Sequence, residues 1–502
     1  MEVNQVVDVD AIKKEPMKKT NITLVCFLFT LFTTLAQQQK DNDSNYKKRV
    51  LESTEVDFLA SYYNQDGDNA SVTGGIGTEE LTDFAPSIII SMPLNADDVL
   101  TVDVGISTYT SASSSNLDPF DSSGASGSGD DDDDDIILDP TSVTGSPWVA
   151  SSGPSRQDTW VSVSSAYSHS SDDRNTITGF HASFATEWDY ISFGFGGQLT
   201  KLFNNKNTEL GISAQVYLDK WLPEYPTELD SYLEAGEDLN GGFFAGLPIY
   251  NESGVEIDKN GNPNTNWTPG FSRIQNKARH SYSASVNFSQ IINKRAQFSI
   301  TMDVVQQQGW LANPMQRVYF KDKANYYVGN ANSIPNYTSK TNTDVFQLAD
   351  DIERLPDTRF KIPVGARLNY YLNEIFVLRT YYRFYTDNWG VTSNTVYLEL
   401  PIKFINKFTL YPSFRYYTQT AADYFAGFET HQSTQEFYTS DFDLSEFTTT
   451  QYGLGLNYTD VFTKAHIWNF GLKSLDFKYN KYERNTGLKA NLFSFGCKFI
   501  LD

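Results

Sequence analysis

The chain has 502 residues, a formal net charge of −23 at pH 7 and an aromatic content of 15%. The aromatic content excludes a disordered chain, and an acidic balance with no basic stripe argues against a nucleic-acid partner. Only two cysteines are present, which excludes a disulfide scaffold and a cysteine-ligated zinc site. A helical membrane protein is excluded as well, because the one long apolar stretch lies at the N-terminus.

The N-terminal region has the pattern of a secretory signal peptide. Met17 and two lysines precede an apolar run that ends at a small residue, Ala36. A membrane anchor is the alternative interpretation, but the run is short for a full span. We therefore predict a polar extension ahead of the true start (1–16), a cleaved signal peptide (17–36) and a periplasmic lead (37–48).

The rest of the sequence alternates apolar and polar residues in segments of about nine to ten residues, a length that suits tilted strands across a bilayer. Strands of soluble sandwiches are usually nearer five or six residues. We count sixteen segments, and a missed or added hairpin would give 14 or 18. The segments are 50–63, 84–93, 98–112, 158–170, 175–187, 190–200, 208–218, 280–292, 295–307, 359–372, 375–386, 394–404, 408–417, 448–460, 465–479 and 485–500.

The connections between these segments follow a parity rule. The long ones (113–157, 219–279, 308–358 and 418–447) all come after odd-numbered segments, and the connections after even-numbered segments are short. Outer-membrane barrels show this asymmetry, with long extracellular loops and short periplasmic turns. The predicted fold for 49–502 is therefore all-β, a transmembrane antiparallel up-and-down β-barrel in the outer membrane. A secreted sandwich is the alternative, although its outward face should be polar.

The final segment places Phe493, Phe495, Cys497 and Phe499 on one face. A terminal strand rich in Phe resembles the signal that the barrel-insertion machinery reads, so this machinery and outer-membrane lipid are the expected partners. Cys497 shares the apolar face and is interpreted as a small lipid-facing residue. The Ser- and Gly-rich loop 113–157 contains six consecutive aspartates, whose mutual repulsion is expected to keep it extended and solvated.

Several motifs resemble an uncharacterised family of Gram-negative outer-membrane barrels, a domain of unknown function. The resemblance extends over nearly the whole mature chain and implies the same barrel fold. The resemblance implies no catalytic residue. Genes of the family often lie near genes for thioredoxin-like and flavin-transferring proteins, which hints at a redox partner. The aspartate run and the residues after Phe499 depart from the family pattern. The motifs are TVDVGI (101–106) with TSAS (110–113), GWLANP (309–314), RFYTDNWG (383–390), RYYTQTAAD (415–423) and YNKYER (479–484).

One wall of the predicted lumen is basic. If the apolar face of each strand meets lipid, the opposite face of four consecutive strands carries six cations and the carboxylate of Glu399. Glu55, Asp57 and Asp103 on earlier strands are the other acidic counterparts. A basic wall could bind or select anions, whereas the alternative is a lattice of ion pairs that fills a plugged lumen. The six cations are Lys361, Arg367, Arg379, Arg383, Lys403 and Arg415.

These patterns support two functional hypotheses. The first is a channel or transport protein for small solutes, with anions favoured by the basic wall. The second is an occluded barrel whose loops act as a scaffold for a lipoprotein or for a secretion or redox partner. An enzyme is not expected, because no nucleophile elbow, phosphate loop or dinucleotide fingerprint occurs and the five histidines lack metal-ligand spacing. A hydrolase assembled from neighbouring strands is the outlying alternative.

Overall fold

The computed structural model describes residues 48–111, 158–187, 189–261, 265–275, 277–339, 344–460 and 462–501. The chain divides into two units, Met1–Lys48 and Arg49–Asp502. The predicted signal peptide (17–36), its flanking segments up to residue 47 and the whole of the predicted acidic loop 113–157 lie outside the described residues. The fold is therefore that of the second unit.

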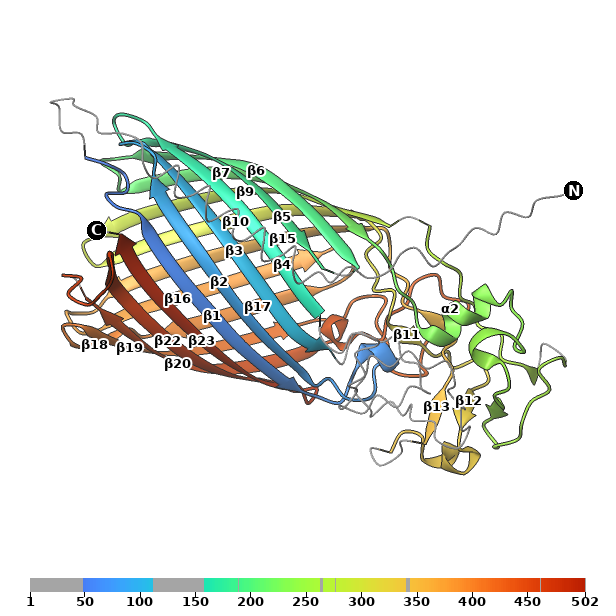
Figure 1. The fold of residues 1–502 in the computed structure, drawn as a ribbon. Coiled ribbons are helices and arrows are strands. Elements are labelled where there is room, and N and C mark those ends of the chain that lie inside the picture. Colours follow the sequence, from blue (N-terminus) through green and yellow to red (C-terminus); the bar gives the residue numbers. More distant parts are fainter. Residues whose placement is uncertain are drawn as a thin grey trace, which may run out of the picture. The chain divides into compact units, whose positions relative to one another are not determined.

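Sixteen long antiparallel strands form one closed barrel, which confirms the predicted fold class (Figure 1). Each strand pairs with its neighbour in the chain, and the first strand pairs with the last to close the ring. Strand β17 has a short continuation, β18 (Ile402–Ile405). The barrel strands are β1 (Glu55–Asp66), β2 (Leu81–Pro93), β3 (Asp98–Ser111), β4 (Asp158–Ser170), β5 (Thr176–Thr186), β6 (Tyr190–Phe203), β7 (Thr208–Trp221), β9 (Ala278–Asn293), β10 (Ala296–Gly309), β15 (Thr358–Tyr371), β16 (Val377–Asp387), β17 (Thr392–Glu399), β19 (Phe408–Gln419), β20 (Phe447–Thr459), β22 (Phe470–Arg484) and β23 (Lys489–Leu501).

Most observed strand boundaries fall within a few residues of the prediction, and β22 is the main difference. The fifteenth strand was expected at 465–479 but extends over Phe470–Arg484. The preceding residues form a small hairpin, in which β21 (His466–Ile467) pairs with the start of β22. Alternating residues before 470 therefore belong to this hairpin instead of the barrel strand.

The outward face of the barrel is apolar because strand residues alternate between its two faces. In β6, Phe193 and Phe195 are 55% and 51% exposed, whereas the alternate residues Ser192 and Gly194 are buried. The ring of Phe193 also packs against that of Phe184 on β5, with centroids 5.0 Å apart. Large exposed apolar side chains are stable in a hydrocarbon environment, so this face is suited to lipid.

The inner wall has two different halves. From β4 to β10 the inward positions are mainly small, as where Ser183 of β5 lies opposite Gly194 of β6 and Ser213 of β7 lies opposite Ser285 of β9. From β15 to β19 the inward positions are large, and Arg367 lies opposite Tyr381 on the neighbouring strand. The small half leaves room inside the ring, and the large half brings cations and phenol groups into it.

The long connections between strands gather at one end of the barrel and form a folded layer, here called the loop layer (67–80, 222–277, 310–357 and 420–446, as far as described). It contains helix α2 (Thr227–Glu234) and two small sheets, one of β11 (Arg317–Val318) and β14 (Asp351–Ile352) and the other of β8 (Tyr250–Asn251), β12 (Tyr326–Gly329) and β13 (Val345–Gln347) (Figure 1). None of the described helices is long and apolar enough to cross a membrane.

The loop layer has its own core. Leu229, Trp267 and Phe346 are almost completely buried in one apolar cluster. Beside it, Arg317 binds Glu228 through two hydrogen bonds of 2.7 and 3.0 Å, and both side chains are fully buried. The Nη1 atom of Arg317 also donates to the carbonyl of Val72 at 3.1 Å, which ties the β1–β2 connection to the layer.

The lipid-facing role of Phe195 can be tested by substitution. We expect Phe195→Arg to lower the free energy of unfolding by about 2–4 kcal/mol, because a guanidinium near the bilayer midplane is poorly solvated. Gln198→Arg, at an inward position of the same strand, should have little effect. Urea unfolding in lipid vesicles measures both, and equal losses would contradict the assignment of the two faces.

Candidate functional site

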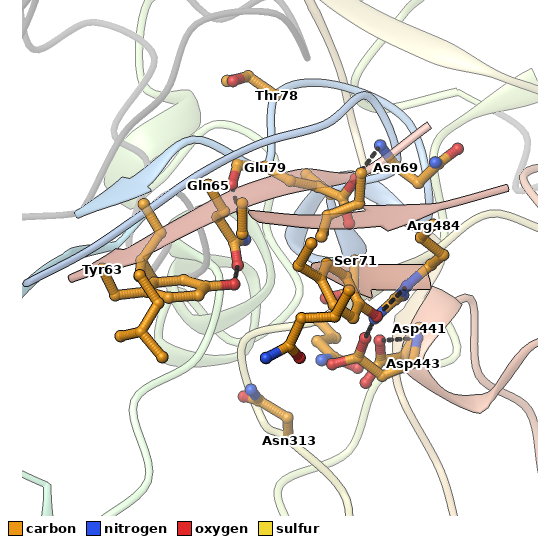
Figure 2. A pocket seen from close by; sticks show the side chains of 18 of the residues that line it. Tyr63, Gln65, Asn69, Ser71, Thr78, Glu79, Asn313, Asp441, Asp443 and Arg484 are labelled. Carbon is orange, nitrogen blue, oxygen red and sulfur yellow. Dashed lines mark hydrogen bonds and ion pairs between the residues drawn. The ribbon is translucent and has the colours of Figure 1, made fainter. Parts of the chain in front are cut away.

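The candidate site lies where the loop layer enters the barrel. Two cavities, of about 480 and 250 Å³, occupy this region. Both are lined by Asn313, Gln316, Asp441 and Asp443, so these four residues stand between them. We call these four residues the partition, and Figure 2 shows three of them beside the larger cavity.

The larger cavity rests against four neighbouring barrel strands, β1, β23, β22 and β20. Register aligns Gln65, Ala490, Tyr482 and Gln451 in one row across these strands. The next row contains Asn480, which faces the cavity with Tyr63 and Leu492. The sheet therefore supplies amides, phenol groups and aliphatic side chains to one surface.

The loop layer supplies the opposite surface of the larger cavity, including Asn69, Ser71 and Glu79 (Figure 2). The backbone N–H of Asn69 donates to Oε2 of Glu79 at 3.0 Å, and its side-chain amide donates to the carbonyl of Thr486 at 2.9 Å. Burial raises the pKa of Glu79. This surface is thus fixed by its own hydrogen bonds.

Arg484 is the cation of the larger cavity, and it is already paired. Its Nη2 atom lies 2.8 Å from Oδ1 of Asp443, and its guanidinium stacks on Phe447 at 4.1 Å from the ring centroid. The Arg484 side chain is 9% exposed, whereas that of Asp443 is 71% exposed. The pair joins the barrel wall to the partition and brings no net charge to the cavity.

Hydrogen bonds to buried carboxyl groups hold the partition in place. Glu353 accepts from the backbone N–H of Asn313 at 2.6 Å, and Oδ1 of Asp441 accepts from the backbone N–H of Asp443 at 2.9 Å. Burial raises the pKa of Glu353 to about 8 and that of Asp441 to about 7. Near neutral pH, Glu353 and in part Asp441 therefore keep protons that exposed carboxyl groups would have released.

The smaller cavity has a basic surface formed by Arg279, Arg359 and Lys361 on the barrel wall. Arg359 donates from Nε to Asp387 at 2.8 Å and stacks on Trp389, 4.3 Å from a ring centroid. Lys361 forms no ion pair with the described residues. This cavity thus opens onto the start of the predicted basic wall.

The structure places the six predicted cations along the inner face of the barrel. Lys361 lies near the loop end of β15 and Lys403 near the turn end of β18, with the four arginines between these levels. Only one of the six forms an ion pair with a described residue, Arg379 with Glu399 at 2.9 Å. Arg367 and Arg415 lie over tyrosine rings, 4.9 and 5.5 Å from the centroids of Tyr381 and Tyr417, respectively.

The predicted acidic counterparts lie elsewhere on the wall, apart from Glu399. Glu55 binds Lys473 and Lys498 at 2.7 and 2.6 Å, and Asp57 lies 3.3 Å from Lys498. One carboxylate oxygen of Asp103 is buried with no hydrogen-bond partner among the described residues. The lysines of β22 and β23 were missing from the prediction, although their alternation with apolar residues could have revealed them.

The partition and the buried carboxyl groups behind it were also missed by the sequence prediction. Asn313 lies inside the motif at 309–314, which marked the segment without indicating its role. Gln316, Glu353 and Asp441 lie in connections with no periodic pattern. Only their three-dimensional contacts identify them.

The fold and its apolar outer face define a β-barrel of the outer-membrane type. The chain belongs to a family of proteins of unknown function, DUF3570, whose sequence profile matches residues 23–493. This confirms the resemblance drawn from the motifs. No enzyme family is indicated, and no curated protein matches the chain.

Solved structures with a similar fold share little sequence with this chain. A bacterial polysaccharide outer membrane secretin is 8% identical, with 91% of this chain and 100% of that chain covered and a TM-score of 0.39. A BenF-like porin from Pseudomonas fluorescens is 8% identical, with 89% and 98% covered and a TM-score of 0.34. The ferric enterobactin receptor of Pseudomonas aeruginosa is 12% identical, with 87% and 54% covered and a TM-score of 0.36. Such weak likeness says nothing about what this chain binds or transports.

The buried carboxyl group of Glu353 predicts a pH-dependent loop layer. The unfolded chain releases this proton near pH 4.5 and the folded chain near pH 8, so stability should fall as the pH rises between these values. Glu353 is expected to contribute about 1.4 kcal/mol per pH unit to the slope, and Glu353→Gln should remove this contribution and leave that of Asp441. Urea unfolding of the loop layer, followed by tryptophan fluorescence from pH 5 to 8, measures the slope. An unchanged slope in Glu353→Gln, or the same loss in the exposed control Glu446→Gln, would refute the assignment.

Proposed function

We propose that the protein is an outer-membrane channel for small solutes and that it favours anions. The observation that carries the proposal is the set of inward cations without carboxylate partners. Lys361, Arg367, Arg383, Lys403 and Arg415 form no ion pair with a described residue. The alternative, a lattice of ion pairs that neutralises the basic wall, requires a carboxylate partner for each of these cations.

The positions of these cations along the lumen strengthen the proposal of an anion-favouring channel. The five cations follow one another from the loop end to the turn end of adjacent strands. An anion moving along this wall would pass from one positive group to the next, as in pores whose preference is set by charged side chains. The facing half of the wall is rich in serines and glycines, and its inward residues include the carboxylates of Glu209, Asp219 and Asp303.

The loop layer limits what can enter. The partition leaves cavities of about 480 and 250 Å³ at the mouth, which suit small molecules and not folded proteins. The smaller cavity includes Lys361, so entry on that side leads directly to the basic wall. Small anions are therefore the solutes that best match both the size and the charge of this route.

The expected location follows from the sequence pattern and the barrel together. An apolar outer face needs lipid around it, and the signal peptide predicted at 17–36 would deliver the chain for insertion by the barrel-insertion machinery. Insertion from the periplasmic side would leave the short turns there and the loop layer at the cell surface.

A scaffold function is the second candidate, and one observation favours it. The loop layer has a buried core and a fully buried ion pair, Arg317 with Glu228. A layer this ordered could present a rigid surface to a lipoprotein or to a secretion or redox partner. In that case the partition would act as a permanent closure of the barrel.

Planar-bilayer conductance tests the proposal. Under a salt gradient we expect a reversal potential that reports anion preference, and Arg383→Glu with Arg415→Glu should shift it towards cations by removing two unpaired positive groups. Lys206→Glu, the same charge change in the turn between β6 and β7, is the matched control and should leave the potential unchanged.

Two results would count against the channel. A conducting barrel whose selectivity ignores the double charge reversal would remove the role of the basic wall. A barrel that never conducts, yet co-purifies with a specific membrane partner, would favour the scaffold.

A further inference from the structure

The smaller cavity is lined by two cations of the barrel wall that pair with no described residue. Arg279 of β9 and Lys361 of β15 both face it, and neither side chain forms a hydrogen bond or an ion pair within the described part of the chain. Both residues are half-buried and not enclosed, so a molecule in the cavity can reach their charged groups. The two cations are therefore available to a ligand.

Arg279 lies opposite a carboxylate that other groups already occupy. The strand register places it across from Asp219 of β7. The two oxygens of Asp219 accept hydrogen bonds from the hydroxyl groups of Tyr190 and Ser192, the latter at 2.7 Å. Because these two hydroxyl groups of β6 hold Asp219, the guanidinium of Arg279 keeps its donors for a molecule in the cavity.

Lys361 lies opposite a carboxylate that is occupied in a similar way. Its register partner on β16 is Asp387, whose side chain is completely buried. One oxygen of Asp387 accepts from Nε of Arg359 at 2.8 Å and from the hydroxyl group of Tyr385 at 2.7 Å. The other oxygen accepts from the backbone N–H of Trp389 at 2.9 Å. Asp387 thus anchors Arg359, and the ammonium group of Lys361 forms no ion pair with it.

These cations share one surface of the barrel wall, because β9, β10 and β15 are adjacent. On the middle strand, Gln307 lies opposite Arg359, and two residues further along Gly309 lies opposite Arg279. The side chain of Gln307 also lines the cavity. A carboxylate suits such a surface, since a guanidinium can donate to both of its oxygens and an ammonium group adds another charged donor.

Three carboxyl groups of the loop layer also line the cavity, but none of them pairs with these cations. Asp443 pairs with Arg484 at 2.8 Å. Glu353 accepts from the backbone N–H of Asn313 at 2.6 Å, and Asp441 accepts from the backbone N–H of Asp443 at 2.9 Å. The head group of an anion in the cavity is therefore expected at the barrel wall, where the unpaired cations are.

Apolar side chains line the rest of the cavity. Trp221, at the end of β7, and Leu355 pack against the core of the loop layer and also line the cavity. Leu444 adds a third apolar group. All three residues are half-buried, so each still presents apolar surface. A short hydrocarbon chain or a single aromatic ring would leave water by packing against them.

We propose that the smaller cavity binds a small organic carboxylate, with the head group at Arg279 and Lys361. The apolar body of this ligand lies against Trp221, Leu355 and Leu444. A volume of about 250 Å³ is below the usual range of pockets for drug-sized ligands, which favours a molecule with one ring or a short chain. This inference rests on the proposed anion channel and narrows its solutes to carboxylates that carry an apolar group.

Isothermal titration calorimetry of the full chain, purified in detergent, tests the site with benzoate and hexanoate. We expect at least one of them to bind with a Kd of about 1 mM or tighter. Acetate lacks the apolar body and benzyl alcohol lacks the charge. Each should therefore bind about tenfold more weakly or worse.

Substitutions of the two cations test the position of the head group. Arg279→Gln and Lys361→Gln each remove one charge but keep a polar side chain, and each should weaken benzoate binding by about tenfold. Lys206→Gln and Arg295→Gln make the same changes at exposed positions in two turns of the barrel. These matched controls should bind benzoate as the unaltered protein does, and far-ultraviolet circular dichroism verifies that all four variants keep their strands.

Three outcomes would overturn the proposal: no binding of benzoate or hexanoate, equal affinity for benzyl alcohol and benzoate, or unaltered benzoate affinity in both folded cavity variants. The titration involves no ion flow, so the two proposals can fail separately. A barrel that binds benzoate without conducting would contradict the channel and leave this site intact. An anion-selective barrel that binds neither carboxylate would do the reverse.

Discussion

The structure depends on complete pairing of backbone hydrogen-bonding groups around a ring. In hydrocarbon, no water is present to satisfy a free N–H or C=O group, so a sheet that crosses a membrane must have no open edge. The β1–β23 pairing meets this requirement, with Glu55 opposite Ile500 at one end and Asp66 opposite Lys489 at the other. Once the ring is closed, alternate residues must face lipid, and their neighbours are free to be polar.

This constraint explains why so much of the fold could be predicted from the sequence. Apolar and polar residues alternate in every barrel strand, because one face of each strand always meets lipid. The length of a connection predicts the end of the barrel at which it lies. The prediction was weakest where alternation continues outside the barrel, as before Phe470, where β21 forms its small hairpin. Parity also assigned Lys361 and the five other cations to the face on which the structure places them.

The loop layer and the partition could not be predicted in this way, because their contacts join residues far apart in the chain without any repeat. Arg317 meets Glu228 across 89 positions, and the Asn313 backbone meets Glu353 across 40. Their sequences carry no period, so neither the burial of Glu353 nor the unpaired oxygen of Gln316 can be read from the local pattern. The lysine partners of the predicted acidic residues could not be predicted for a related reason, since the carboxylates of β1 bind lysines from β22 and β23.

The loop layer contains two kinds of buried polar group, which differ in whether their hydrogen-bonding atoms have partners. This difference bears on the proposed function. Arg317 and Glu228 pair through two hydrogen bonds, and Arg317 also binds the Val72 carbonyl, so this pair holds the layer together. At the partition, Gln316 keeps an unpaired oxygen and Glu353 is buried as an acid, so this region is less stable than packing alone would allow. Groups that lower stability are most readily explained where solutes are bound or admitted. The partition lies between the larger cavity and the start of the basic wall, so the proposed channel would depend on it.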